Sequence, residues 1–485
     1  MNEEPERQYP DDSGGARLRS GPSPVELAEM ALVEAELDQR WPETKIEPSL
    51  TRIATLMDLL GSPQQSYPAI HIAGTNGKTS VTRMIDALLT ALHRRTGRIT
   101  SPHLQLATER ISIDNAPISP AKYVETYREL LPYIEMIDAQ SATAGGPAMS
   151  KFEVLTGMAY AAFAEAPVDV AVVETGMGGT WDATNVIDGQ VAVITPIGLD
   201  HVDYLGPDLA AIAGEKAGII KRAPESLVPR DNVAVIAQQE PEAMEVLLRR
   251  AVEVDAAVAR EGSEFQVIAR RIAVGGQQLE LQGLGGVYDE IFLPLHGEHQ
   301  ARNAVLALAA VEAFFGAGAQ RQLDIDAVRA GFASVTSPGR MERMRSAPTI
   351  FIDAAHNPAG ARALAATLGE EFDFRKLVGV VAVLGDKDAA GILEALEPVF
   401  DEIVVTTNGS PRAMDIDSLA NLAVQRFGDE RVVTADTLPD ALETAIAIAE
   451  EVGDPVEAVS GAGVVVTGSV VTAGAARALF GKDPA

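Results

Sequence analysis

The sequence predicts an α/β protein with two domains, in which helices cover both faces of mostly parallel sheets. Short apolar runs rich in Val and Ile alternate with helical segments along most of the chain, which is typical of parallel sheets with crossover helices. The chain has 485 residues, too many for a single hydrophobic core. The alternation breaks at a segment with proline and glycine, residues 336–347, and resumes after it.

The first domain is expected over residues 25–335. Before it, residues 1–24 are polar and rich in proline and glycine, which predicts a disordered tail rather than a signal peptide. Residues 24–60 have a helical pattern, and helical segments such as "SKFEVLTGMAYAAFAEA" then separate the strand candidates. The strand candidates are "YPAIHIAG", "GRITSPHL", "VDVAVVETGMGG", "VAVITPIGLDH" and "DNVAVIAQ".

The end of the first domain has a different character. Residues 264–295 alternate over shorter stretches around a Gly-Gly turn, which predicts a small antiparallel region. The run "HQARNAVLALAAVEAFF" predicts a closing helix. Residues 336–347 lack a regular period and are expected to form a linker.

The second domain, residues 348–485, is smaller and of ordinary domain size. Each of its strand candidates lies next to a helical segment, so we expect a second α/β sheet. The candidates are "TIFIDAAHN", "KLVGVVAVLGDKD", "EIVVTTNGS", "RVVTAD" and "GVVVTGS".

The composition excludes several classes of protein. The net charge of −30 argues against general nucleic-acid binding, which needs a basic surface. No apolar run approaches the roughly 18 residues that cross a bilayer. The absence of cysteine excludes disulfides, thiolate zinc sites and a thioester intermediate. We therefore expect a cytoplasmic protein with no nucleic-acid or membrane partner. We also expect a monomer.

A turn with one lysine, "HIAGTNGKTS" over residues 71–80, joins the first strand candidate to a helix. Backbone N–H groups and the dipole at a helix N-terminus favour anions. Lys78 adds a charge and Thr79 a hydroxyl, which suit a polyphosphate and its magnesium. The usual phosphate-loop pattern has a glycine six residues before the lysine, where this chain has Ile72. An ordinary strand-to-helix turn with an exposed lysine therefore stays open.

Polar residues follow the other strand candidates of the first domain. Ser101 follows "GRIT", Glu174 follows "VDVAVV", and Asp200 and His201 follow "VAVIT". Ligands of open α/β sheets gather at the carboxyl ends of the strands, so these groups could hold magnesium, with the histidine also suiting manganese. The alternatives are a solvated strand end for Glu174, a capping or core histidine for His201, and turn chemistry for Ser101.

Three further segments carry candidate functional residues. The glycines of "GMGGTWDATN" would let the backbone approach a ligand, or would form a flexible turn. Lys216 could bind phosphate, could be carboxylated on its amine, or could be a solvated helix lysine. In "FIDAAHNPAG", Asp353 and His356 could contact a ribose and the reacting groups, or the segment could only cap a helix. Arg340 could clamp charge on domain closure or be a plain linker arginine.

Taken together, these segments resemble a known family. "GTNGKT" without the upstream glycine resembles the phosphate loop of the Mur ligase superfamily. Nine further stretches, in order and at matching spacing from about residue 35 to the end, are similar to the folylpolyglutamate synthases and bifunctional dihydrofolate synthases. They are "TSPHL", "ERI", "SKFE", "ETGMGGTWDATN", "LDHVDYLG", "EKAGII", "HGEHQARNA", "SPGRMER" and "DAAHNPAGA".

The resemblance implies a fold and a role for individual residues. It implies an N-terminal P-loop ATPase domain with a smaller C-terminal Rossmann-like domain. The expected catalytic residues are Lys78, Lys216 (carboxylated in the family) and His356. The expected nucleotide-binding residues are Thr75, Asn76, Gly77, Lys78, Thr79, Ser80, Asn303, Arg340 and Asp353. The expected pterin-side residues are Ser150, Lys151, Phe152, Glu153, Trp181, Asp182 and Ala183, and the expected Mg²⁺ ligands, for one or two ions, are Ser101, Glu174 and His201.

The resemblance also implies the reaction. ATP would phosphorylate a carboxylate of dihydropteroate or of a reduced folate, and L-glutamate would attack the acyl phosphate, giving ADP and phosphate. Two departures stand out: Thr180 where the family commonly has arginine, and Thr175 where valine is usual. The first removes a positive charge near the expected pterin site and bears on substrate choice. The alternatives are another amino-acid ligase of the superfamily and a nucleotide-binding switch without ligase activity.

Overall fold

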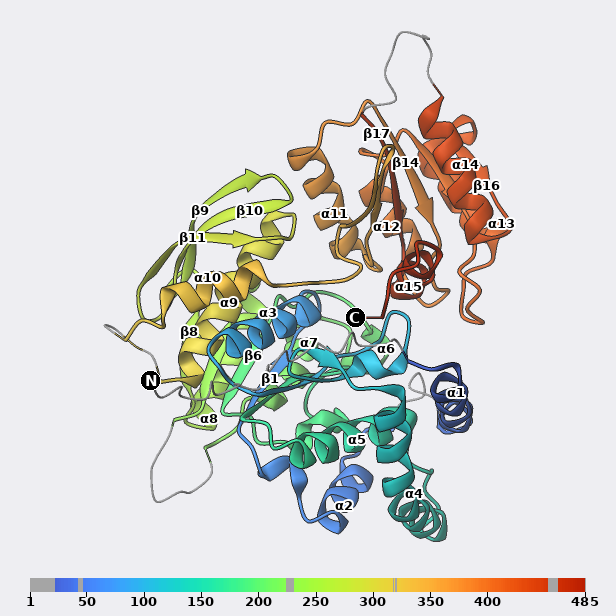
Figure 1. The fold of residues 1–485 in the computed structure, drawn as a ribbon. Helices are drawn as coiled ribbons and strands as arrows, with labels where there is room; N and C mark the ends of the chain where they lie inside the picture. The colour runs from blue at the N-terminus through green and yellow to red at the C-terminus, as the bar shows by residue number, and fades with distance from the viewer. Residues whose placement is uncertain are drawn as a thin grey trace, which may run out of the picture.

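The chain folds into two α/β units (Figure 1), and a computed structural model describes residues 22–41, 47–223, 231–316, 318, 321–451 and 461–484. The predicted α/β class is confirmed. Most of the expected tail, residues 1–21, lies outside the described residues, but Pro24 already belongs to helix α1 (Pro24–Asp38), which Ser23 caps. In the described part of the chain, no helix is long and apolar enough to cross a membrane.

The larger unit is built on an eight-stranded sheet in the order β4-β3-β2-β5-β1-β6-β7-β8. In this spatial order, every neighbouring pair from β2 through β5, β1, β6 and β7 to β8 is parallel. At the other edge, β3 pairs antiparallel with both β2 and β4. Because the carboxyl ends of β2, β5, β1 and β6 lie next to one another, residues that follow them share one edge of the sheet. The strands are β1 (Ala69–Ala73), β2 (Thr96–Ile99), β3 (Ile111–Ile113), β4 (Ala116–Pro117), β5 (Val170–Glu174), β6 (Val191–Ile194), β7 (Val233–Ile236) and β8 (Ala257–Arg260).

Helices cover both faces of this sheet. One core joins α3 and α9 to the face that includes Ile70 and Ile72, and another joins α2, α4 and α5 to the opposite face. The helix predicted after the lysine turn is confirmed as α3, and its apolar residues Val81, Met84, Ile85, Leu88 and Leu89 are fully buried. The helices are α2 (Thr51–Leu59), α3 (Lys78–Ala91), α4 (Pro120–Thr143), α5 (Lys151–Glu165), α6 (Val202–Leu205), α7 (Leu209–Lys216), α8 (Pro241–Glu253), α9 (Glu298–Phe314) and α10 (Ile325–Ala333).

The predicted helical pattern over residues 24–60 is wrong at the described residues between α1 and α2, which are 39–41 and 47–50. Trp41 forms an isolated parallel bridge with Ser150, and residues 47–49 have no regular structure. Pro48 accounts for part of this break, because proline lacks a backbone donor and disfavours the helical conformation at the residue before it.

The predicted antiparallel region is confirmed as a separate sheet in the order β11-β10-β9. Its strands are β9 (Gln266–Ala273), β10 (Gly276–Gln282) and β11 (Val287–Leu293), and it lies beside the C-terminal unit in Figure 1. Leu279, Leu281 and Ile291 bury its inner face in the same core as α3 and α9. This sheet therefore extends the larger unit.

The C-terminal unit has a six-stranded sheet in the order β12-β13-β17-β14-β15-β16, parallel except at β12. Its strands are β12 (Glu342–Ser346), β13 (Thr349–Ile352), β14 (Lys376–Val381), β15 (Glu402–Val405), β16 (Val432–Thr434) and β17 (Ala462–Thr467). Its helices are α11 (Pro358–Glu371), α12 (Ala389–Leu396), α13 (Ile416–Phe427), α14 (Leu438–Glu450) and α15 (Val470–Leu479).

Part of the expected linker, residues 336–347, is therefore the edge strand β12. The strand escaped prediction because its charged residues hide any alternation and its pairing shifts register between Arg343 and Arg345. Charged edge strands are common, since they discourage pairing with other chains. The domain limits drawn from the sequence remain predictions.

Candidate active site

The lysine turn is shaped by two glycines that no other residue can replace without movement. Gly74 follows β1 at φ +149°, and a Cβ there would lie 1.8 Å from Thr195 Oγ1. Gly77 caps α3 at φ +89°, and a Cβ there would lie 2.7 Å from Asn303 Oδ1. The N–H groups of Thr75 and Asn76 donate to Pro196 O. The N–H groups of the first turn of α3 have no partner within the helix and could meet an anion.

The side chains of this turn face a cavity of about 270 Å³. Lys78 Nζ lies 3.2 Å from the carbonyl oxygens of Gly74 and Thr75, and burial lowers its pKa. Thr79 Oγ1 donates to Glu174 Oε1 at 2.8 Å. Ser80 Oγ lies 3.3 Å from Ser337 Oγ, in the segment that leads to the second sheet. Strand β1, the lysine turn and helix α3 thus direct the Lys78 ammonium group and several N–H groups into one cavity.

The three expected metal ligands line this cavity together. Burial raises the pKa of Glu174 to about 7, although Lys78 opposes the shift. Glu174 Oε2 is buried and has no hydrogen-bond partner among the described residues. Burial lowers the pKa of His201 to about 4, so the ring is neutral at pH 7 and can offer a lone pair. A hard oxygen without a partner beside a hydroxyl and an imidazole fits a divalent cation.

The expected metal site does not consist of acidic and histidine side chains alone. Among the described residues, no group of three His, Asp or Glu side chains is arranged to hold a metal. The expected set includes the Ser101 hydroxyl, and the phosphates of a nucleotide would supply further oxygens. The metal roles of Ser101, Glu174 and His201 therefore stay predictions.

Lys216, at the end of α7, is buried against the turn. Its Nζ donates to Gly74 O at 2.7 Å. Burial lowers its pKa to about 7, and the nearby Lys78 adds to the shift. The neutral amine is therefore well populated near neutral pH, which the simpler hypothesis of a solvated helix lysine does not explain.

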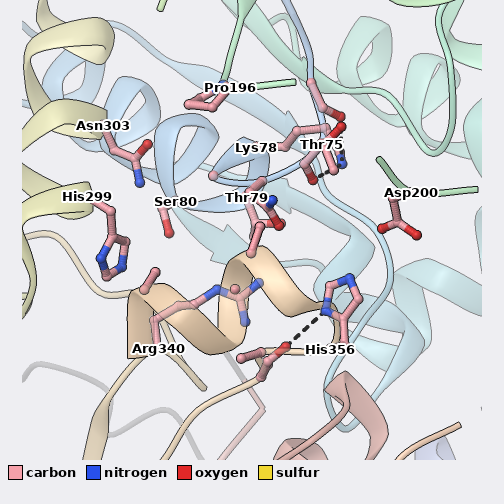
Figure 2. Close-up of a pocket in the computed structure, with 18 of the residues that line it drawn as sticks. Thr75, Lys78, Thr79, Ser80, Pro196, Asp200, His299, Asn303, Arg340 and His356 are labelled. Carbon is pink, nitrogen blue, oxygen red and sulfur yellow. Dashed lines mark hydrogen bonds between the residues drawn. The ribbon is translucent and has the colours of Figure 1, made fainter. Parts of the chain in front are cut away.

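Arg340 and His356 lie on the other side of the same cavity from the lysine turn (Figure 2). Asp353 lines this cavity as well. Asp353 accepts from the N–H groups of Met341 and Ala355, both at 2.9 Å, so it orders the segment that carries Arg340. Burial lowers the pKa of His356 to about 4. Its Nδ1 lies 3.0 Å from Ala354 O, so the neutral ring donates there and leaves Nε2 with a free lone pair.

Two residues of this unit that we had not assigned join it to the first. Asn357 Nδ2 donates to Asn76 Oδ1 at 3.0 Å and to Asp200 Oδ2 at 3.3 Å. Lys387 Nζ lies 3.0 Å from Asp200 Oδ1. Although burial opposes it, His201 and Lys387 hold the pKa of the Asp200 carboxyl below its usual range. The "DKD" after β14 was the sequence signal for Lys387, since it follows a strand end.

A second cavity, of about 570 Å³, opens beside the first. It is lined by six of the expected pterin-side residues, Ser150, Phe152, Glu153, Trp181, Asp182 and Ala183. It also includes residues that sequence reasoning missed, Trp41, Glu47, Arg52, Lys387 and Arg412. The two cavities share Ser101, Pro102, Gly176, Met177, Asp200 and His201. A group held in one can therefore meet a group held in the other.

The predicted segment "SKFE" serves several purposes. Ser150 and Glu153 form a capping box at the start of α5, and the Glu153 carboxylate also accepts from Arg52 Nε at 3.1 and 3.2 Å. Lys151 does not line the cavity; its Nζ binds Glu34 at 2.8 Å and Asp38 at 2.7 Å in α1. Lys151 is the first residue of α5, and its side chain points towards α1.

The glycine loop after β5 is held by its own polar residues. Asp182 accepts from Met177 N at 2.8 Å and from Thr184 N at 3.0 Å, and burial raises its pKa. Thr180 donates to Glu215 O through both its N–H and its hydroxyl. Thr180 thus ties the glycine loop to α7, the helix that ends at Lys216.

Comparisons with known proteins agree with this arrangement. The Mur ligase middle domain matches residues 72–311, and the Mur ligase glutamate ligase domain matches residues 339–469. The dihydrofolate synthase/folylpolyglutamate synthase of Mycobacterium tuberculosis is 70% identical over 482 residues, 98% of each chain. The Bacillus subtilis protein of the same description is 34% identical over 76% of this chain and 83% of its own. A solved Mycobacterium tuberculosis folylpolyglutamate synthase complexed with ADP has a TM-score of 0.90 and 69% identity, covering 95% of this chain and all of that one.

Proposed function

This chain belongs to the Mur ligase family, among the dihydrofolate synthase/folylpolyglutamate synthases, and from that premise we propose how its residues act. It is an ATP-dependent ligase that adds L-glutamate to folates. We propose that it accepts both dihydropteroate and the γ-carboxylate of reduced folates. The observation that supports this assignment is a pair of adjoining cavities. One contains the lysine turn, the other contains Trp181, and six residues line both.

The first step takes place where the cavities meet. A carboxylate oxygen of the acceptor bonds to the γ-phosphorus of ATP, and the bond from that phosphorus to the β-phosphate oxygen breaks, releasing ADP. Lys78, Arg340 and the N–H groups at the start of α3 stabilise the charge on the transferring phosphoryl group. Glu174, Ser101 and His201 would hold Mg²⁺, which when bound supplies further electrostatic stabilisation of the phosphates.

The second step is attack by glutamate. Its amine bonds to the acyl carbon, and the bond from that carbon to the phosphate oxygen then breaks, so phosphate leaves. Neutral His356, with Nε2 free, can accept the amine's proton. Asn357 and Lys387 hold the two units together around the acyl phosphate, which limits its hydrolysis by water.

We further propose that Lys216 is carboxylated. The neutral amine is the form that reacts with CO₂, giving a carbamate and a proton, and burial makes that form abundant near pH 7. The product would replace a cation at the turn with an anion that offers two oxygens. A cytoplasmic location and a monomeric state remain proposals, which cell fractionation and size-exclusion chromatography would test.

The defining experiment measures coupling. With purified protein, ADP release should require ATP, a pterin acceptor and L-glutamate together, and each acceptor should give a product one glutamate longer. Dihydropteroate and a reduced folate are assayed separately, which tests the two activities independently. Rapid ADP release without acceptor and glutamate would contradict the proposal.

A further inference from the structure

Both tryptophans of this chain lie at the same cavity. The sequence has two tryptophans in 485 residues, and Trp41 and Trp181 both line the cavity of about 570 Å³. Trp181 belongs to the glycine loop after β5, whereas Trp41 comes from the N-terminal segment, outside both matched family domains. We propose that Trp41 is an acceptor-binding residue that forms a second aromatic wall against the planar ring of the acceptor, and that Lys151 positions it. This proposal rests on the ligase function above.

Trp41 is fixed to the rim of the cavity through its backbone. It forms a bridge with Ser150, and Lys151 N donates to Trp41 O at 3.3 Å. The preceding residue, Arg40, donates to Met149 O at 3.0 Å and pairs with Asp138 at 2.8 Å. Trp41 therefore has a defined place next to the capping box of α5.

Helix α1, which leads into Trp41, is held by a cluster of polar contacts. Lys151 Nζ binds Glu34 and Asp38 with its side chain only 12% exposed. The Tyr123 hydroxyl also donates to Glu34, and the Tyr127 hydroxyl donates to Glu36 at 3.1 Å. Lys151 thus contacts both α1 through its side chain and Trp41 through its N–H. This explains why a residue expected at the substrate site lies outside the cavity.

The chemistry of the cavity suits a flat ring system. Phe152 and Tyr204 line it as well, so aromatic side chains come from four separate segments. Aromatic rings prefer offset-stacked or edge-to-face contacts, and each such contact adds to the burial of apolar area. Trp41 does not line the cavity of the lysine turn. Its contribution should therefore affect acceptor binding and leave nucleotide binding unchanged.

Steady-state kinetics of Trp41 variants test the wall. Trp41→Ala should raise the KM for dihydropteroate roughly 3- to 10-fold, the scale of one lost aromatic contact, with the KM for ATP unchanged. Trp41→Phe should recover much of the loss. Leu32→Ala is the matched control, because Leu32 is 67% exposed on α1, the helix that leads into Trp41. Equal changes in both KM values, or no change in either, would overturn the proposal.

Fluorescence gives a readout that does not depend on turnover. In a Trp181→Phe variant, Trp41 is the sole tryptophan, and saturating dihydropteroate should protect it from quenching by acrylamide. L-Glutamate alone should give no protection. Quenching that dihydropteroate leaves unchanged would show that the acceptor does not cover Trp41.

A double-mutant cycle tests Lys151 as a positioning residue. Lys151→Met should raise the acceptor KM with little effect on kcat, and Lys151→Arg should restore it by keeping the charge. In the Lys151→Met/Trp41→Ala double variant the effects should not add, because Lys151 acts through Trp41. Additive effects would overturn the positioning role. A wild-type protein without acceptor-dependent ADP release would instead refute the ligase function itself, which separates the two failures.

Discussion

Single residues at the turn have environments that their type alone does not predict. Lys216 is buried and Lys78 is half-buried beside Gly74, and desolvation lowers the pKa of each. Two free ammonium groups at one carbonyl repel each other, whereas a carbamate at Lys216 would attract Lys78. Electrostatic organisation of this turn therefore depends on the chemical state of one lysine.

Lys216→Ala should lower turnover by roughly 10²–10³, the scale of one preorganised electrostatic group. Formate or acetate should then restore part of the activity by supplying the missing carboxylate. Lys216→Arg should stay inactive, since arginine keeps the positive charge and does not take up CO₂. A fully active arginine variant would show that only a cation is needed. Incorporation of ¹³C from labelled bicarbonate, measured by NMR, gives a readout independent of activity.

Glu174→Ala should raise the Mg²⁺ concentration needed for half-maximal activity and lower turnover, because Glu174 Oε2 is buried without a partner among the described residues. Glu174→Gln is the matched control, since its amide oxygen can still accept from Thr79 while the charge is lost. A Mg²⁺ titration of activity, with unchanged circular dichroism, checks the expectation. Unchanged titrations for both variants would remove Glu174 from the metal site.

At the scale of elements, strand β1, which leads into the lysine turn, carries a buried histidine at its middle residue. His71 lies opposite residues of β5 and β6 and is fully buried. Its Nε2 lies 2.9 Å from Thr184 Oγ1, which itself donates to Asp182 Oδ1 at 2.5 Å. Nε2 must therefore carry the hydrogen, and Nδ1 is buried without a partner in the described chain. Burial, with a smaller effect of Lys221, lowers the pKa of His71 to about 3.

This shift predicts acid sensitivity of the fold. Because the unfolded chain binds a proton at an ordinary pKa of about 6.5 and the folded chain does not until about 3, stability is full above pH 6.5 and falls as the pH drops through that window. His71→Asn removes the titration. The loss of unfolding free energy between pH 7.5 and 4.5, measured with urea, should be smaller in the variant by about 3 kcal/mol. Equal losses would assign the acid sensitivity to other groups.

At the scale of the whole molecule, catalysis depends on how the two units meet. The C-terminal unit reaches the lysine turn through Asn357, Asp200 through Lys387, and the β9–β11 sheet through Glu371. The buried Glu371 carboxylate contacts Arg270, His296 Nδ1 and Gly297 N. The contacts at Asp200 lie at the two cavities, because Asp200 lines both of them.

Lys387→Met should lower kcat and increase the ADP released per ligated product, because it leaves the Asp200 carboxylate without its cation and loosens the closure that excludes water. Lys376→Met is the matched control, since Lys376 pairs with Glu402 at 2.8 Å within the sheet of the C-terminal unit. ADP and product are measured in the same reaction. Unchanged coupling in Lys387→Met would mean that Lys387 does not contribute to closure.

The sequence by itself determined the α/β class, the lysine turn and the polar strand ends. These features are local: a strand, a glycine at positive φ and the first turn of a helix adjoin in the chain, so their geometry follows from backbone preferences. The edge strand β12 was missed because local pattern is weak where charged residues protect an edge.

Only the tertiary structure decided which distant residues meet. Asn357 bonds Asn76 across 281 positions and Lys387 bonds Asp200 across 187, and no periodicity encodes such pairs. Trp41 and Trp181 look unrelated in the sequence yet line one cavity, and Lys151 turns from the expected substrate towards α1. The physical reason is that packing of helices and sheets sets these positions, and packing depends on the whole chain at once.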